Sequence, residues 1–285
     1  MKGDHIPPAV TSPESDLLCA QGNPDLNLVW ETIRTEAKQV SDSEPRLAPL
    51  ITDVFISRNS LACSVAARLS RKLAREDMTR DELLPLLEEI LLEHPELVSS
   101  MASDLISICD RDPACHTIMQ PLLSYKGFLA IATYRLGHQM WKNDRHDLAY
   151  YFQSLASEVF GVDIHPAARL GCGLFLDHAT SVVIGETSIV EDNVSILHEV
   201  TLGGTGKTSG DRHPVVRSGV MIGAGAKILG RVEIGYGAKI GAGSVVLANV
   251  PPHTTVAGVP AVVVGTTESE NPAAAMDQSL TCSGI

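Results

Sequence analysis

An acid and an imidazole stand side by side in the segment LFLDHATSVVIGETSIV. Asp177 and His178 suit the deprotonation of a hydroxyl group, because a neutral imidazole accepts a proton near neutral pH and a carboxylate can hold its other nitrogen. The segment GDRHP places a second histidine, His213, beside Arg212. A guanidinium group can bind a carboxylate through two parallel hydrogen bonds. These residue types favour a reaction in which a hydroxyl group of a small charged molecule becomes a nucleophile.

The residues around both histidines repeat with a period of six. Aliphatic residues begin the hexads within 164–176, 184–202 and 216–246. Such hexads are typical of short strands that turn corners and stack their aliphatic side chains in one interior, which predicts a parallel β-helix.

Two interruptions of the hexads coincide with the two histidines. One is the Asp177-His178 pair, where the repeat slips by two residues, and the other is the polar, glycine-rich segment 203–215, which we expect to loop out of the β-helix. Irregular places in a repeat protein tend to carry its function. We expect the slip to turn His178 outward into a cleft, with Asp163 two coils below it on the same edge.

Residues 26–161 have helical periodicity instead. In TRDELLPLLEEILLEHPELV, Thr79 and Glu82 have the spacing of a capping box and leucines follow at intervals of three and four. The sequence therefore predicts an α+β protein with an N-terminal all-helical domain and a C-terminal β-helix. The predicted parts are a mobile segment 1–25, a helical domain 26–161, a β-helix 162–265 with its loop 203–215, and a flexible tail 266–285.

Composition restricts the partners and the location. A formal net charge of -12 argues against nucleic acid or an anionic membrane as a partner. No apolar run approaches the roughly 18 residues that a membrane span needs, and residues 1–25 lack the features of a signal or transit peptide. The six cysteines are scattered, so we expect free thiols, a cytoplasmic protein and no metal site.

Several blocks in order resemble serine O-acetyltransferase, a family of hexapeptide-repeat acyltransferases. The blocks are DRDPAC, YKGFLA, VDIHPAARLGCGLFLDHAT, SILHEVTLGGTGK, GDRHP, GVMIGAGAKILG and PPHTTVAGVPA. The resemblance covers roughly residues 26 to 285 and implies a left-handed β-helix. It also implies direct transfer of acetyl from acetyl-CoA, a co-substrate and not a tightly bound cofactor, to the hydroxyl of L-serine. Two departures are Ser181, where the family usually has glycine, and SILHE in place of SILHH or SILQS.

The family's catalytic and substrate-binding residues carry over by motif. The resemblance implies that His178 is the general base, that Asp163 orients it, and that His213 belongs to the same catalytic set. It further implies that two acids hold the ammonium group of serine and that a cation and an imidazole hold its carboxylate. The expected substrate-binding residues are Asp112, Asp177, Arg212 and His213.

CoA is bound in this family in the groove between neighbouring β-helices of a trimer. The matching residues are Gly204, Ala224, Gly225, Lys239 and Ala242, and Gly204 is also a candidate N–H donor to the tetrahedral oxyanion. Lys227 and Arg231 are further cations near the expected CoA phosphates. The resemblance implies a trimer or a dimer of trimers.

The family also suggests an inhibitor and a protein partner. L-cysteine is the expected feedback inhibitor at the serine site. The C-terminal residue Ile285 is expected to insert into O-acetylserine sulfhydrylase, since a free carboxylate after an apolar side chain is a plausible anchor.

Three other interpretations stay open from the sequence. One is a hexapeptide acetyltransferase for a sugar or an antibiotic, which leaves the helical half and the Arg212-His213 pair unexplained. A second is a γ-type carbonic anhydrase, whose H-x-x-x-x-H zinc spacing this sequence lacks. The third is a catalytically inactive scaffold for the sulfhydrylase.

Overall fold

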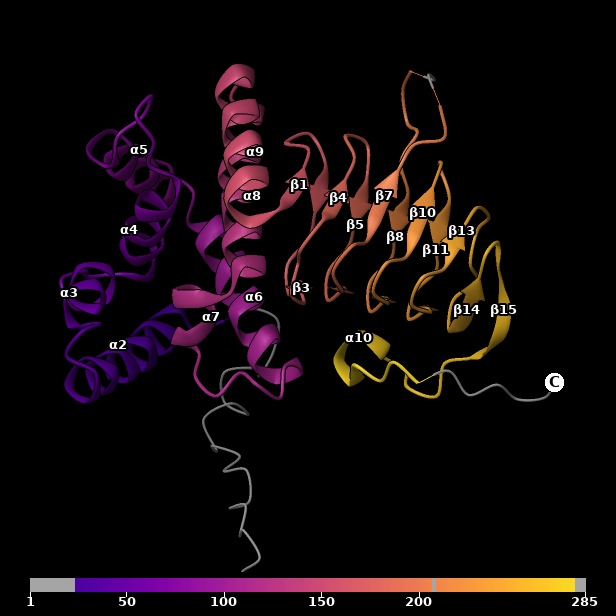
Figure 1. Cartoon of the computed structure of the whole chain (residues 1–285), viewed down its shortest axis with the longest axis horizontal. Helices are drawn as coiled ribbons and strands as arrows, with labels where there is room; N and C mark the ends of the chain where they lie inside the picture. Colours follow the sequence, from indigo (N-terminus) through magenta and orange to yellow (C-terminus); the bar gives the residue numbers. More distant parts are fainter. Residues whose placement is uncertain (1–23, 207–208, 280–285) are drawn as a thin grey trace, which may run out of the picture.

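The computed structural model describes residues 24–206 and 209–279, so the predicted segment 1–25 lies almost entirely outside the described residues. Within the described part, a group of helices precedes a stack of short strands (Figure 1). The helical part ends at Phe160, and Gly161 in a left-handed conformation leads directly into the first strand. None of the described helices is long and apolar enough to cross a membrane.

The helical part follows the hydrophobic periodicity of the sequence. The predicted capping box is confirmed, with the Thr79 backbone N–H donating to Glu82 at 2.8 Å, and Leu83 and Leu87 are fully buried behind it. The elements are α2 (Leu26–Ser43), α3 (Ala48–Ile51), the π-helix η1 (Thr52–Ile56), α4 (Leu61–Leu73), α5 (Arg80–Glu93), α6 (Pro95–Arg111), α7 (Met119–Ser124), α8 (Lys126–Lys142) and α9 (His146–Phe160).

The β-helix is a stack of triangular coils whose strands form three sheets in the described residues. One column of aliphatic residues, Ile164, Ile184, Leu202, Ile228 and Val246, runs in register through the first sheet and is buried throughout. This column confirms the interior predicted from the hexads. The first sheet has the order β1-β4-β7-β10-β13, the second β11-β8-β5-β2 and the third β15-β14-β12-β9-β6-β3.

The strands are short, and a longer gap separates β7 from β8. Their bounds are β1 (Val162–Ile164), β2 (Arg169–Leu170), β3 (Phe175–Leu176), β4 (Val182–Ile184), β5 (Ile189–Val190), β6 (Ser195–Ile196), β7 (Thr201–Gly203), β8 (Val215–Val216), β9 (Met221–Ile222), β10 (Lys227–Leu229), β11 (Glu233–Ile234), β12 (Lys239–Ile240), β13 (Val245–Val246), β14 (Thr254–Gly258) and β15 (Ala261–Thr266).

The lengths of the coils explain both interruptions of the repeat. The coil that runs from Val183 to its strand partner Thr201 consists of three hexads and is the regular one. The preceding coil, from Asp163 to Val183, is longer by two, and the following coil, from Thr201 to Lys227, is longer by eight. The two extra residues lie in the turn that carries His178, and the eight extra residues make the projecting loop between β7 and β8 (Figure 1).

A buried ion pair joins the helices to the first coil. Arg135 of α8 binds Asp104 of α6 at 2.7 Å and also donates to the carbonyl of Gly171, while Asp104 accepts the backbone N–H of Leu174. Gly127, at the start of α8, lies so close to β3 that an added Cβ would stand 2.1 Å from the carbonyl oxygen of Leu176. The ends of α6 and α8 are therefore held directly against the strand that precedes Asp177.

The described residues of the predicted tail lie against the β-helix. The chain after β15 runs back along the third sheet and forms α10 (Pro272–Ala275), which lies between that sheet and α6 (Figure 1). Ala273 is fully buried, and its backbone is bound by Ser195 and by Gly219. Small residues in NPAAA let the backbone approach the coils closely, a feature that their low hydrophobicity concealed in the sequence.

Candidate active site

The first part of the site is a strained turn between β3 and β4. His178, Ala179 and Ser181 all have φ near +60°, a left-handed conformation that L-residues with side chains rarely adopt. Ala179 is fully buried and anchors the turn, while the His178 side chain is 75% exposed. The two extra residues of the coil thus present an imidazole to solvent, as the slip in the repeat predicted.

Two carboxylates lie beside this imidazole. Asp177 has an oxygen 3.7 Å from Nε2 of His178, and Asp112, which ends α6, lines the same cavity of about 720 Å³. Burial raises the pKa of Asp177, the His178 ring opposes that shift, and the Asp112 carboxylate adds to it. Two acids facing one cavity favour a cationic ligand, such as an ammonium group, that would lower this mutual repulsion.

His198 is a residue of this site that the sequence analysis missed. Its ring meets that of His178 edge to face, with centroids 5.8 Å apart, and its buried Nδ1 has no hydrogen-bond partner among the described residues. The pairing of Leu176 with Ile196 places His198 one coil above His178. The available signal was that the two histidines are separated by the length of the first coil. We call the group Asp112, Asp177, His178 and His198 the His178 corner.

The second part of the site lies across the first sheet, at the next corner. His213 is 8% exposed, and its Nδ1 accepts the backbone N–H of Thr187 at 3.1 Å. The neutral ring therefore carries its proton on Nε2 and can donate it to a ligand. Arg212 binds Glu186 at 2.5 Å. Burial lowers the pKa of His213, and the neighbouring Arg212 lowers it further.

Asp163 belongs to this second corner more than to the first. It lies on β1, in the same coil as His178 and not two coils below it, because the coil closes at the His178 turn. Its Oδ1 accepts a hydrogen bond from Gln153 of α9 at 2.6 Å, and it acts electrostatically on His165, whose pKa burial lowers. Among the described ion pairs of His178, only Asp177 is a partner. We call the group Asp163, His165, Glu186, Arg212 and His213 the Arg212 corner.

The predicted CoA residues divide between the two corners. Ala224, Gly225 and Ala242 continue the His178 corner along later coils, and the N–H of Gly225 donates to the carbonyl of His198. Gly204 instead begins the projecting loop, where its added Cβ would lie 3.5 Å from Arg212. Backbone groups with small side chains thus line both corners.

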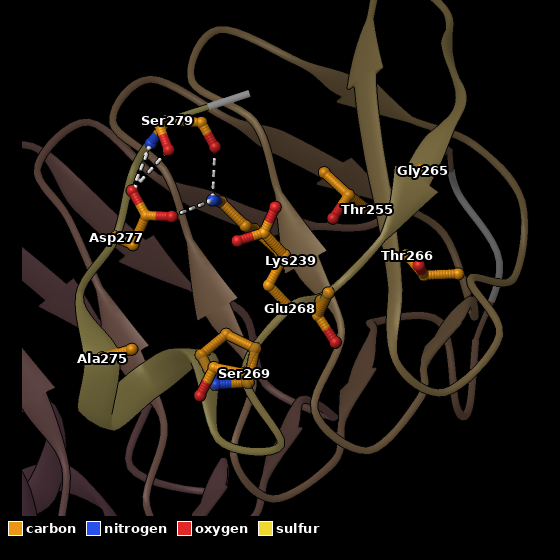
Figure 2. Close-up of a pocket in the computed structure, with 11 residues that line it drawn as sticks. Lys239, Thr255, Gly265, Thr266, Glu268, Ser269, Ala275, Asp277 and Ser279 are labelled. Carbon is orange, nitrogen blue, oxygen red and sulfur yellow. Dashed lines mark hydrogen bonds and ion pairs between the residues drawn. The ribbon is translucent and has the colours of Figure 1, made fainter. Parts of the chain in front are cut away.

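Lys239 is held by the tail of the chain. Its Nζ donates to the carbonyl of Ser279 at 2.6 Å and lies 3.6 Å from Asp277, at one side of a cavity of about 250 Å³ (Figure 2). Lys239 is only 7% exposed. Of the other two cations, Lys227 donates to the carbonyl of Glu199, and Arg231 donates to that of His213. All three are therefore bound within the chain, so an anion at any of them competes with an existing contact.

Comparison with known proteins decides the family. Residues 29–133 match the family described as serine acetyltransferase, N-terminal, and residues 213–248 match the bacterial transferase hexapeptide family. A serine acetyltransferase of Salmonella typhimurium strain LT2 is 51% identical over 254 residues, covering 89% of this chain and 93% of that protein. The chain belongs to the serine acetyltransferase family.

Solved structures of this family share the fold. A serine acetyltransferase in complex with cysteine has a TM-score of 0.86 and 48% identity, covering 88% of this chain and 98% of that one. The enzyme of Brucella abortus strain S19 with coenzyme A has a TM-score of 0.82 and 51% identity, covering 84% and 96%. The soybean enzyme complexed with serine has a TM-score of 0.82 and 48% identity, covering 84% and 98%.

Proposed function

We propose that this chain transfers the acetyl group of acetyl-CoA to the side-chain hydroxyl of L-serine, giving O-acetylserine and CoA. The observation that carries the proposal is the His178 corner, where an outward imidazole and two carboxylates, Asp112 and Asp177, face one cavity. The family relatives with serine and with coenzyme A bound support the same two substrates. Family membership also favours this function over the sugar acetyltransferase and carbonic anhydrase alternatives.

The proposed roles follow from charge. His178 takes the proton of the serine hydroxyl as the oxygen attacks the thioester carbonyl, and Asp112 and Asp177 hold the serine ammonium. Arg212 and Nε2–H of His213 hold the serine carboxylate, since both are donors at the Arg212 corner. Asp163, which lies at the Arg212 corner, orients the base of a neighbouring copy of the chain. The N–H of Gly204 stabilises the oxyanion of the tetrahedral intermediate.

The test is release of the CoA thiol from acetyl-CoA with L-serine as acceptor. We expect serine-dependent release, and we expect a His178→Ala variant to lose at least two orders of magnitude in kcat, as loss of a general base does. Release with another hydroxyl acceptor but not with serine would overturn the substrate. Folded protein without release from any acceptor would favour the inactive scaffold.

We further propose that a second copy of the chain completes the site. The groups for the ammonium and for the carboxylate of serine lie at two corners separated by the first sheet, whereas those groups of one serine molecule are neighbours. A ring of copies would bring the His178 corner of one copy to the Arg212 corner of the next. A trimer through the β-helices satisfies this condition.

Mixing two inactive variants tests this arrangement. His178→Ala leaves the Arg212 corner intact, and Arg212→Ala leaves the His178 corner intact. Random reassembly of equal amounts in a closed ring makes about a quarter of the sites wild type, so activity should return to roughly that fraction. If the mixture stays inactive although mass spectrometry detects mixed oligomers, each site lies within one chain.

We also propose three finer points from the sequence. L-cysteine inhibits by occupying the serine site, since its thiol replaces the hydroxyl and a relative binds cysteine; inhibition that serine does not relieve would contradict this. Ile285 lies outside the described residues, and its proposed capture by the sulfhydrylase predicts that deleting it abolishes that binding. The third point is a cytoplasmic location, and recovery of the protein with a membrane or organelle fraction would contradict it.

A further inference from the structure

Two cysteine thiols lie in contact directly behind Asp112. Cys109 is in the last turn of α6 and Cys115 follows the helix, and their Sγ atoms are 3.4 Å apart. Both sulfurs also contact the carbonyl of Thr117, at 3.7 and 3.4 Å. Formation of a disulfide would bring the sulfurs about 1.4 Å closer, to the usual length of about 2.05 Å. None of the proposed catalytic roles uses either thiol.

The contact between the two sulfurs makes the two thiols unequal in acidity. The hydrogen bond between the two sulfurs lowers the pKa of Cys115, while the same bond and burial raise the pKa of Cys109. A thiolate beside a second thiol is the arrangement of reactive dithiols. Cys172, on the first coil, differs because burial raises its pKa to about 11. Cys109 and Cys115 are both partly exposed, and Pro113 and Ala114 between them line the site cavity.

We propose that Cys109 and Cys115 form a reversible disulfide and that this bond controls the position of Asp112, and with it the affinity for serine. The oxidant is a peroxide. The Cys115 thiolate attacks one oxygen of hydrogen peroxide, the O–O bond breaks, a sulfenic acid forms, and the hydroxide that leaves takes up a proton to become water. The Cys109 thiol then attacks that sulfur, the S–S bond forms and a second water leaves. A dithiol reductant restores both thiols and becomes a disulfide itself.

The link to Asp112 is geometric. The loop that the disulfide would close contains Asp112. The N–H of Asp112 donates to the carbonyl of Ile108, its own carbonyl accepts the N–H of Cys115, and its carboxylate accepts the N–H of Ala114, all at 2.8–2.9 Å. Arg111 is anchored to the β-helix through Ser195. The backbone movement that brings the two sulfurs together therefore falls within residues 112–115.

The expected effect falls on serine alone. Displacing a binding group by about 1 Å can cost up to about 100-fold, so oxidation should raise the KM for serine at least tenfold. The KM for acetyl-CoA should stay unchanged, because the residues proposed for CoA lie on later coils and in the projecting loop. This inference rests on the proposed role of Asp112 in serine binding.

The bond is detected by peptide mapping of the full chain after hydrogen peroxide treatment. Trypsin cleaves after Arg80, Arg111 and Lys126, so the two cysteines lie on peptides 81–111 and 112–126, and only the disulfide keeps these peptides linked. We expect the linked pair after oxidation and its loss with dithiothreitol. Absence of the linked pair at peroxide levels that oxidise the protein would overturn the proposal.

The effect on binding is measured by serine kinetics and by calorimetric titration of serine into both redox forms. Cys115→Ser and Cys109→Ser should each abolish the peroxide effect, while Cys63→Ser, which removes a thiol from α4, should retain it. A linked pair with unchanged KM and unchanged serine affinity would refute the control of Asp112. If the reduced protein released no CoA with serine, the proposed function would fail, while the linked peptides would still decide whether the bond forms.

Discussion

Gly185 offers a way to move His213 without altering any charged group. Gly185 follows β4, and an added Cβ would stand 2.1 Å from both Cδ2 and Nε2 of the His213 ring. Ordinary contact begins near 3.4 Å, so in Gly185→Ala the ring must move by more than one ångström. The φ of Gly185 is outside the left-handed region, so alanine adds no backbone strain there. The substitution therefore tests the position of His213 and little else.

The shift is incompatible with the present contacts of the ring. Nδ1 of His213 is held by the N–H and hydroxyl of Thr187 at 3.1 and 3.0 Å, and these bonds do not survive a displacement of that size. A misplacement of about 1 Å at a substrate-positioning group costs about 100-fold, or about 2.7 kcal/mol. We expect kcat/KM for serine to fall by about that factor in Gly185→Ala.

The assay is CoA thiol release at varied serine, with the melting temperature measured alongside. Gly137→Ala is the matched control, because its added Cβ lies 3.7 Å from Phe152 in ordinary contact and alanine favours the helix by up to about 1 kcal/mol. The control should keep wild-type activity and melt slightly higher. Native melting of Gly185→Ala together with kcat/KM within twofold of wild type would refute the role given to the His213 position.

Three further predictions concern stability and CoA. Ser181 has a φ of 60°, so Ser181→Gly should relieve about 1 kcal/mol of strain and raise the melting temperature by about 2–4 °C in calorimetry. Burial lowers the pKa of His138, His165 and His213 in the folded state. Because a histidine in the unfolded chain has a pKa of about 6.5, the unfolded chain binds more protons than the folded chain below that pH, and stability falls as the pH drops through it. His138→Gln should therefore flatten the decline in melting temperature between about pH 7.5 and 5.5. Asp277→Asn should weaken the hold of the tail on Lys239, which still donates to the carbonyl of Ser279, and lower the KM for acetyl-CoA by about twofold to fivefold without changing the KM for serine; an unchanged KM for acetyl-CoA would show that the Asp277 carboxylate does not compete with CoA at Lys239.

The hexads carried enough information to predict the β-helix and the outward turn at His178. Aliphatic side chains recur at each coil, so the buried column from Ile164 to Val246 follows from counting residues. The same counting predicts that two extra residues must bulge at Asp177-His178. The helical half was equally accessible, because apolar periodicity and the Thr79 cap mark its helices.

Contacts between the repeats and the rest of the chain could not be counted in this way. Asp163 is tied to Gln153 of α9, and Lys239 is covered by the backbone of Ser279, yet neither partner belongs to a hexad. A repeat determines which way a side chain points from its own coil, whereas segments outside the repeat determine whether that side chain is available to a ligand. Substitutions at Gln153 or Asp277 should therefore change substrate binding while the β-helix remains intact, and variation among related chains in these segments can adjust the site without altering the coils.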